Sequence, residues 1–544
     1  MRVSPPPPVR VALWQVALLL ACLVVWSTWP LAWHLNSAVT DLGDPLLNAW
    51  ALAWNAHALV TDPLAFANAN IFHPETNTLA YSELLLLPSV MLAPLSWMGL
   101  DPIGVHNLLL VLGCAGSGLT TFVLVRRLTG HDGAALVSAV MFAVTPYRME
   151  QFPKVQLALT LWWPLALLLV HDLATRPRRV TVLWLALAMA AACYSSLYWG
   201  LFGGVFVAVV GGVVWLQTPG ARAALAGRLA AAAVVAGLLV APLAVPYLAA
   251  ARVVGARSVD EVRAWSAEPR DYLVAHPESA VYGDEQHPGS PERRMFPGYV
   301  TPMLALAAFV PPVAPAAIPY LTAGVVAADL SLGLNAPGYG WLFAHVPGLR
   351  ALRVPARFAM CVALALSVLA GLGAARVLRG RTVVVQWAMV TVFVALVGAE
   401  GSMRHQTVAS PPEVFPAVYQ WLAAQPAGVV CEYPVGPLEG RVGPQDPTYM
   451  YYSTRHWKPL VNGYSGFTPP SYRRLLEELD GFPDDRSVAH LRARGVRYLL
   501  LHEPFYINGD YHAHVATLRA RTDLQWAGRF RWRGGSVSDV FVVR

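Results

Sequence analysis

Two aspartates, Asp41 and Asp44, follow the first apolar segment of the chain and stand three residues apart. Residues 46–60 behind them carry tryptophans and leucines in a pattern that predicts an amphipathic helix lying in a membrane interface. A carboxylate held partly out of water beside such a helix can have a raised pKa and act as a general base toward a hydroxyl group. In the alternative interpretation Asp44 only caps this helix, with Pro45 in its first turn, and Asp41 is a solvated loop acid.

The same segment continues with more polar side chains, among them His73 and Glu83. We count both as candidate substrate-binding residues, because they gather polar groups next to the apolar run 84–98. This run is short and contains two prolines, so we expect it to lie in the interface or to re-enter the membrane rather than to cross it.

A second group of charges, Arg148, Glu150 and Lys154, lies between two later apolar segments. Lys154 is one of only two lysines in a chain that otherwise uses arginine. The three side chains fit either of two interpretations: flanking anchors that extend to the membrane surface, or residues that hold an anionic group. Their expected place outside the membrane runs against the usual inward bias of basic residues, which favours the second interpretation.

A third group holds three arginines, Arg350, Arg353 and Arg357, within residues 345–358. A guanidinium group binds phosphate with two parallel hydrogen bonds, although interfacial anchoring is again the alternative. Acids in a first external loop and cations at two later junctions together predict a ligand that combines an apolar anchor with phosphate. A lipid-linked phosphate donor meets both requirements.

The composition places these groups in a membrane protein. Of the 544 residues, 56% are hydrophobic and 13% are charged, whereas average globular proteins have about 25% charged residues. We predict a polytopic α-helical membrane protein in which residues 1–400 form the transmembrane domain. Eleven apolar runs are expected to cross: 11–31, 103–125, 133–147, 155–171, 180–198, 199–216, 229–249, 299–314, 315–334, 356–378 and 382–400.

The distribution of arginines sets the expected orientation. With Arg2 and Arg10 in the cytoplasm and 84–98 not crossing, four later basic clusters also fall on the cytoplasmic side. These clusters are Arg126–Arg127, Arg176–Arg179, Arg222/Arg228 and Arg376–Arg381. These clusters account for the formal net charge of +7, so we expect no nucleic-acid partner. External loops 32–102 and 250–298 and the tail 401–544 then share the opposite face.

The tail, residues 401–544, is polar and rich in aromatic residues and turns, which predicts a small extracytoplasmic α/β domain. We expect helices at 414–425, 472–480 and 487–494, and strands at 429–435, 497–502 and 539–543. The five cysteines show neither C-x-x-C spacing nor a paired framework, so neither a disulfide nor a cysteine metal site is expected.

On these motifs the chain resembles the GT-C superfamily of polytopic glycosyltransferases, in particular the branch that includes aminoarabinose transferases, protein mannosyltransferases and YfhO-type proteins. The matching features are the D-x-x-D after the first span, the interfacial helix, the external domain and three short runs: Arg126–Gly130, Tyr147–Gln156 and Leu349–Phe358. The adjacent acidic pair of the mannosyltransferases and the W-W-D-Y-G motif of oligosaccharyl transferases are absent from the sequence. Protein substrates are therefore not expected.

The resemblance implies a function for each group of charges. Asp41, or second to it Asp44, would be the general base, and Glu150 the second acid of the next external loop. Arg148, Lys154, Arg353 and Arg357 would bind the lipid phosphate. No cofactor is expected, and a divalent metal is not indicated.

The expected reaction moves a sugar from a polyprenyl-phosphate donor to a hydroxyl acceptor, a glycolipid or cell-envelope glycan, outside the bacterial cytoplasmic (inner) membrane. Two alternatives stay open. One is a transporter or flippase for a lipid-linked sugar. The other is a non-catalytic glycan-binding assembly protein that would use the tail aromatics Tyr449, Tyr451, Tyr452, Trp457 and Tyr464.

Overall fold

The computed structural model describes residues 10–255, 257–283, 290–346, 349–350, 352–404, 408–436, 445–506 and 509–544. Arg2, which the orientation argument used, lies outside the described residues. The chain divides into two compact units, each built from separate stretches of sequence. Unit 1 comprises Met1–Ala32, Leu108–Pro242 and Ala256–Gln406, and unit 2 comprises Trp33–Asn107, Leu243–Gly255 and Thr407–Arg544.

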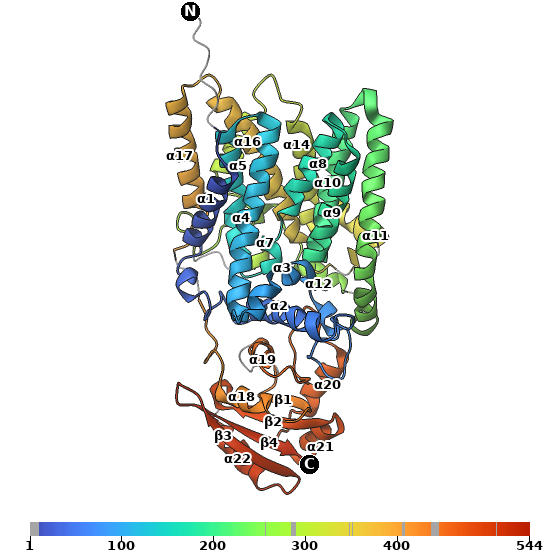
Figure 1. The fold of residues 1–544 in the computed structure, drawn as a ribbon, viewed down its shortest axis with the longest axis vertical. Helices are drawn as coiled ribbons and strands as arrows, with labels where there is room; N and C mark the ends of the chain where they lie inside the picture. Colours follow the sequence, from blue (N-terminus) through green and yellow to red (C-terminus); the bar gives the residue numbers. More distant parts are fainter. Residues whose placement is uncertain are drawn as a thin grey trace, which may run out of the picture. The chain divides into compact units, whose positions relative to one another are not determined.

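Unit 1 is helical, and its helices run side by side (Figure 1). The helices that build it are α1 (Leu13–Ser27), α4 (Pro102–Thr129), α5 (Asp132–Ala143), α6 (Pro146–Glu150), α7 (Val155–Ala158), α8 (Trp162–Thr175), α9 (Arg179–Ser195), α10 (Leu197–Leu216), α11 (Arg222–Val254), α12 (Val259–Ala264), α13 (Val300–Ala307), α14 (Ala317–Ser331), α15 (Pro337–His345), α16 (Ala359–Leu378) and α17 (Val383–Glu400). The beginning of α4, through Asn107, and the end of α11, from Leu243, are assigned to unit 2. Three short 3-10 turns carry loop residues: η4 (Pro269–Leu273), η5 (Pro291–Arg293) and η8 (Pro355–Phe358).

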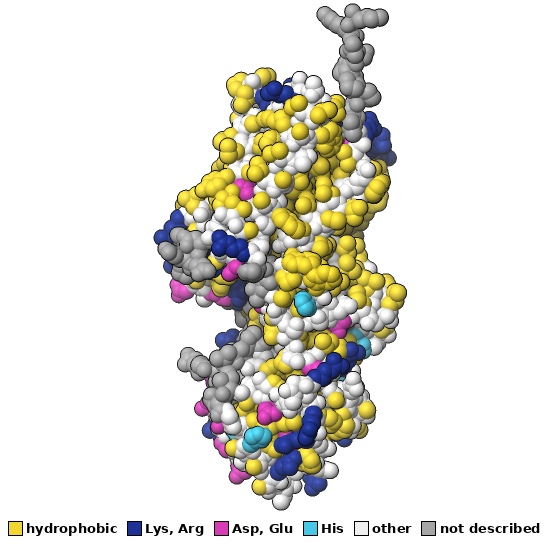
Figure 2. Space-filling view, turned by 90° about the vertical axis from the view of Figure 1, so that its left-hand side faces the viewer, with side chains coloured by type: hydrophobic (Ala, Val, Ile, Leu, Met, Phe, Trp, Pro, Cys, Tyr) yellow, Lys and Arg dark blue, Asp and Glu magenta, His cyan; other side chains and the backbone are white. Residues whose placement is uncertain are grey.

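Membrane-length helices make this a helical membrane protein. Among the described residues, six helical stretches are long and apolar enough to cross a bilayer: Pro102–Thr129, Val155–Thr175, Leu197–Leu216, Pro219–Val254, Pro355–Leu378 and Val383–Glu400. Four shorter apolar helices accompany them: Leu13–Ser27, Leu86–Trp97, Arg179–Ser195 and Ala317–Ser331. On the face drawn in Figure 2, hydrophobic side chains cover most of the helical surface.

Two of the expected spans are much shorter than their apolar runs. The run 133–147 forms α5, which ends at Ala143 ahead of Pro146. The run 299–314 forms α13, which has eight residues and ends before Pro311 and Pro312. Proline cannot continue a helix and disfavours the helical conformation of the residue before it. At 1.5 Å per residue α13 is only about 12 Å long, well short of the ~30 Å hydrocarbon core.

Helix α16 is the centre of unit 1. It packs against α5, α13 and α14, and nearly all of its residues are buried. The approach to α13 is so close that a Cβ atom at Gly373 would lie 1.8 Å from the Leu304 carbonyl oxygen. Small residues allow membrane helices to pack this tightly. The Ser138 hydroxyl also donates to the Ser367 carbonyl (2.6 Å), which joins α5 to α16.

Unit 2 combines the first loop segment with the tail. It contains α2 (Asp44–Thr61) and α3 (Leu86–Trp97), and an antiparallel bridge pairs Val39 with Ala409. α2 confirms the helix expected at 46–60. The run 84–98 forms the twelve-residue helix α3, about 18 Å long, which is too short to span the hydrocarbon core unaided.

The tail carries a four-stranded sheet in the order β1-β2-β4-β3. The strands are β1 (Val429–Tyr433), β2 (Val496–His502), β3 (Leu524–Arg531) and β4 (Val537–Val543); β1 and β2 are parallel and the other pairs antiparallel. Helices α18 (Ala417–Ala423), α19 (Gln445–Ser453), α20 (Pro470–Glu478), α21 (Asp485–Ala493) and α22 (Tyr511–Arg519) accompany the sheet. The three expected strands and three expected helices are present, whereas β3, α19 and α22 were not anticipated.

Candidate functional site

Three of the charged residues expected from the sequence, Glu150, Lys154 and Arg357, lie together in unit 1. With Glu292 and Arg294 they form what we call the Glu292 cluster, of which Arg148 and Arg353 are not part. Two proline-initiated turns position part of it, η5 for Glu292 and η8 for Arg357. Proline fixes φ near the helical value and has no N–H to leave unsatisfied at a helix start.

Short polar contacts hold the α6 side of the cluster against η5. The Thr145 side chain accepts the backbone N–H of Arg148 (3.1 Å), and Pro146 follows at the start of α6. At the other end of α6, the Gln151 amide nitrogen donates to the Pro291 carbonyl (2.7 Å). Glu292 directly follows Pro291, so this contact brings its carboxylate close to α6 and Lys154.

Glu292 bridges the two cations. Its Oε1 accepts from Lys154 Nζ (2.6 Å) and from Arg357 Nη2 (2.5 Å), while Oε2 accepts from Arg357 Nε (3.1 Å). Burial alone would raise the pKa of Glu292, but the adjacent Arg357 and Lys154 outweigh burial and hold the pKa far below its ordinary value. Glu292 therefore stays ionised, and the three groups together carry one net positive charge.

Glu150 is the acid of the cluster that titrates near neutrality. Its Oε1 lies 3.5 Å from Arg294 Nη1, and its Oε2 lies 3.6 Å from His276 Nε2. Burial raises the pKa of Glu150 to about 7, against the opposing effect of Arg294 and Lys154. Among the described residues Oε2 has no hydrogen-bond partner. A carboxylate with this pKa and an unused lone pair can accept a proton from a hydroxyl group.

Two hydrogen-bond donors, one in the cluster and one beside it, also have no acceptor among the described residues. The buried Tyr147 hydroxyl and Arg294 Nε have no hydrogen-bond partner among the described residues. A tyrosine hydroxyl is protonated at neutral pH, so that of Tyr147 can donate a hydrogen bond. Buried polar groups are normally paired, and unpaired donors beside a net positive charge suit an anionic ligand.

Arg148 differs from its expected role. Its side chain is buried, and its Nε donates to the Phe142 carbonyl (2.7 Å) while Nη2 donates to Thr160 Oγ1 (2.9 Å). Two further contacts reach the carbonyls of Leu157 and Ala158. The guanidinium thus satisfies carbonyl groups where α5 and α7 end. This is a structural role, and we leave Arg148 out of the proposed phosphate-binding residues.

The Tyr198 hydroxyl on α10 binds the backbone between Arg353 and Arg357. Its hydroxyl donates to the Val354 carbonyl and accepts the Val354 N–H, both at 2.8 Å. Arg357 lies over the Tyr198 ring at 5.4 Å, and Arg353 lies over the Trp265 ring at the same distance. Aromatic faces hold guanidinium groups without neutralising their charge.

The other expected site residues, Asp41, Asp44, His73 and Glu83, belong to unit 2. Asp41 is exposed and accepts the backbone N–H of Gly43 (2.8 Å). Asp44 accepts the Tyr464 hydroxyl (3.0 Å). Gly43, rather than Asp44, occupies the N-cap of α2, so the capping interpretation of Asp44 is one residue out of register.

His73 and Glu83 are half-buried in the segment that follows α2. The backbone N–H of His73 donates to the Leu460 carbonyl (2.8 Å), which ties this segment to the tail within unit 2. Burial lowers the pKa of His73, so its ring is neutral at pH 7. A neutral ring can accept or donate one hydrogen bond but cannot attract a phosphate by charge.

Sequence reasoning missed Glu292, Arg294 and His276. The signal available was weak: the run Pro291–Arg294 places one acid before two arginines in a loop that the sequence predicts to be external. Nothing in that pattern says which distant cations pair with the acid. Arg293, the neighbour of Glu292, binds Asp271 (2.7 Å) and Glu268 (2.8 Å) instead, and so anchors the loop.

Metal binding has no candidate residues in the described part of the chain. There, no three histidine, cysteine or acidic side chains come together in a way that could hold a metal ion. All five cysteines are free thiols. Comparison with protein-family models and with curated proteins finds no match for this chain. The functional argument therefore depends on the geometry of the Glu292 cluster.

Proposed function

We propose that the protein is a membrane glycosyltransferase of the GT-C type, which transfers a sugar from a polyprenyl-phosphate donor to the hydroxyl group of a glycolipid or envelope glycan. One observation supports this proposal above the others. The Glu292 cluster contains both an acid with a pKa of about 7, Glu150, and more positive than negative charges. Transfer from a phosphate donor needs both of these features.

The charge balance of the cluster suits a phosphate group. Lys154 and Arg357 share the single charge of Glu292, which leaves one positive charge. Arg294 adds a second whenever Glu150 is protonated, since Glu150 is then neutral. A lipid phosphate would balance this excess, and the Tyr147 hydroxyl and Arg294 Nε would be available to donate to its oxygens.

The proposed reaction is a displacement at the anomeric carbon of the sugar. The acceptor oxygen forms a bond to that carbon, and the bond from the carbon to the phosphate oxygen breaks with its electron pair leaving on the phosphate. Cations of the cluster stabilise the departing phosphate. Glu150 takes the proton of the acceptor hydroxyl. Positioning both substrates at the membrane supplies much of the rate, and the leaving phosphate needs no proton.

Asp41 and Asp44 stay second candidates for the base, because the family resemblance indicates them. The topology proposed with this function has an odd number of crossings, a cytoplasmic N-terminus and an extracytoplasmic tail in a bacterial inner membrane. Reporter fusions test it: residues 130 and 430 should report opposite sides of the membrane. A finding that both lie on one side would contradict the odd number of crossings.

The decisive experiment measures sugar release from a labelled polyprenyl-phosphate donor by the purified protein in lipid. We expect Glu150→Gln to abolish turnover and the exposed Glu477→Gln, a matched control in α20, to leave it unchanged. Loss in Asp41→Asn or Asp44→Asn with Glu150→Gln still active would move the base to unit 2. Donor movement across the bilayer without sugar release would instead identify a flippase.

The glycan-binding alternative loses three of the five aromatic residues on which it depends. Tyr449, Tyr451 and Tyr452 are all fully buried, so their rings cannot stack on a sugar. They are core aromatics of the tail: the Tyr452 hydroxyl donates to the Glu413 carbonyl (2.7 Å), and the Tyr449 hydroxyl to the Pro434 carbonyl (3.0 Å).

A further inference from the structure

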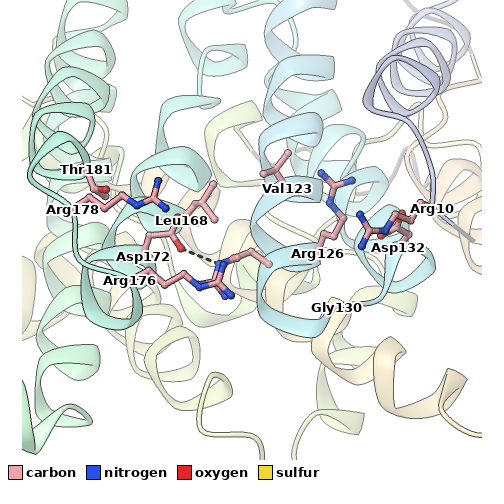
Figure 3. Close-up of a pocket in the computed structure, with 11 residues that line it drawn as sticks. Arg10, Val123, Arg126, Gly130, Asp132, Leu168, Asp172, Arg176, Arg178 and Thr181 are labelled. Carbon is pink, nitrogen blue, oxygen red and sulfur yellow. Dashed lines mark hydrogen bonds and ion pairs between the residues drawn. The ribbon is translucent and has the colours of Figure 1, made fainter. Parts of the chain in front are cut away.

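A second concentration of charge in unit 1 surrounds a cavity of about 770 Å³, which we call the arginine pocket (Figure 3). Its lining includes Arg10 before α1, Arg126 and Arg127 at the end of α4, and Arg176 and Arg178 between α8 and α9. Helix α8 leads from α7 to this pocket and is about 21 Å long at 1.5 Å per residue, so the pocket is separate from the Glu292 cluster.

The arginines are only partly neutralised. Arg127 Nε binds Asp172 (2.9 Å), and Asp132 accepts the backbone N–H of Val11 (2.7 Å). Five arginines against these two aspartates leave an excess of three positive charges in the lining. In the described part of the chain, no ion pair joins the other four arginines to an acid. Figure 3 shows that they enter from two sides, Arg176 and Arg178 from one and Arg10 and Arg126 from the other.

The pocket also has an apolar part and lies at the ends of membrane-length helices. Val123 and Leu168 contribute to its lining, and α4 and the α7–α8 stretch both end beside it. Concentrated arginine marks the cytoplasmic end of membrane helices. The cytoplasmic leaflet is rich in anionic lipid, and basic pockets between helices on that side bind anionic headgroups.

We propose that the arginine pocket binds the phosphate of an anionic phospholipid. This site is independent of glycosyl transfer, because it uses none of the residues of the Glu292 cluster. Arg176 and Arg178 bind the phosphate from one side and Arg126 binds it from the other. Val123 and Leu168 contact the start of the lipid's apolar part. Arg127 is held in place by Asp172 and Thr175, the latter at 2.9 Å.

Native mass spectrometry of the full chain in detergent tests the proposal by counting lipids retained from phosphatidylglycerol or phosphatidylcholine. The variant is Arg176→Gln/Arg178→Gln, whose two side chains are exposed and unpaired by any described acid. The matched control is Arg379→Gln/Arg381→Gln, which removes the same charge from the exposed turn between α16 and α17 and touches no residue of the pocket lining. The His131–Gln386 contact (3.2 Å) places that turn at the same end of unit 1.

We expect the wild-type chain to retain phosphatidylglycerol in preference to phosphatidylcholine, and the pocket variant to lose about tenfold or more in affinity for it. The control variant should keep the wild-type affinity, and an excess of inorganic phosphate should not displace the lipid. Equal retention of both lipids overturns the proposal, as does equal loss in both variants, which would indicate diffuse charge attraction. Displacement by inorganic phosphate also overturns it, because the pocket would then take a soluble anion.

Discussion

Arg357 donates two hydrogen bonds to Glu292, with Nη2 2.5 Å from Oε1 and Nε 3.1 Å from Oε2. The two residues are 65 positions apart, and both side chains are buried. A bidentate pair of this kind fixes the orientation of the guanidinium plane. It also locks the loop that carries Glu292 to the start of α16, so the same contact shapes the site and stabilises it.

Replacing Glu292 with Gln should destabilise the protein strongly, because Lys154 and Arg357 would keep their buried charges without a counter-charge. Breaking a buried pair by removing one partner costs about 3–5 kcal/mol. Thermal unfolding in a fixed detergent measures the effect. The double variant Glu292→Gln/Arg357→Gln should recover part of the loss, and no recovery would show that the pair is not coupled.

The activity of the protein should rise with pH through about 7, because Glu150 must be ionised to accept a proton and burial raises its pKa to about 7. Turnover of the labelled donor between pH 5 and 9 gives the profile; these values bracket that pKa with about two units on each side. Glu150→Asp should keep a related profile at lower rate. A profile without an inflection near 7 would contradict the assignment of Glu150 as the base.

The contribution of Glu150 to the stability of the protein should fall with pH, whereas the activity should rise. Glu150 has a pKa of about 7 in the folded chain and an ordinary value of 4.5, so between these values the folded state holds more protons than the unfolded state. Its contribution to the free energy of unfolding therefore falls as pH rises from 4.5 to about 7. Unfolding of wild type and Glu150→Gln across this window measures it, since only the wild type should carry this slope.

Much of the architecture could be predicted from the sequence, because lipid-facing helices need long apolar runs. The two expected spans that fall furthest short of membrane length, α5 and α13, end near prolines whose effect the apolar count did not weigh. Strand β3 was missed because its apolar residues, Trp526 and Phe530, stand among arginines and a glycine on an edge strand. The neighbouring strand β4 supplies the pairing that the local pattern does not show.

The candidate site was only partly predictable. Residue type and position identified Glu150, Lys154 and Arg357, since charges at expected membrane boundaries are conspicuous in so apolar a chain. Sequence alone could not separate Arg148 from them, because a buried arginine that caps carbonyl groups and a ligand-binding arginine look the same in a linear pattern. Glu292 depended on a pairing across 65 and 138 positions, which no local spacing encodes.

The structural role of Arg148 can be separated from ligand binding. Arg148→Gln should lower the unfolding temperature, because the carbonyls of Phe142 and Leu157 lose charged donors in a buried place. Each such loss costs about 1–3 kcal/mol. Arg148→Lys should not rescue the stability, since an ammonium group lacks the planar arrangement of donors. The affinity of the folded fraction for the polyprenyl-phosphate sugar should stay at the wild-type level. A loss of that affinity without a loss of stability would return Arg148 to the binding residues.

The tail sheet contains a buried hydrogen-bonded pair whose disruption should destabilise it. Glu432 on β1 and His502 on β2 are fully buried and hydrogen-bonded to each other, and His502 Nδ1 lies 2.7 Å from Ser538 Oγ on β4. His502→Leu would leave the buried Glu432 side chain without this hydrogen bond, at a cost of about 1–3 kcal/mol. Glu432→Leu/His502→Leu should be closer to wild type, because neither polar side chain is then buried without the other. Hydrogen exchange of the β2 amides measures both variants, and equal protection in the single and double variants would mean that the pair contributes nothing beyond packing.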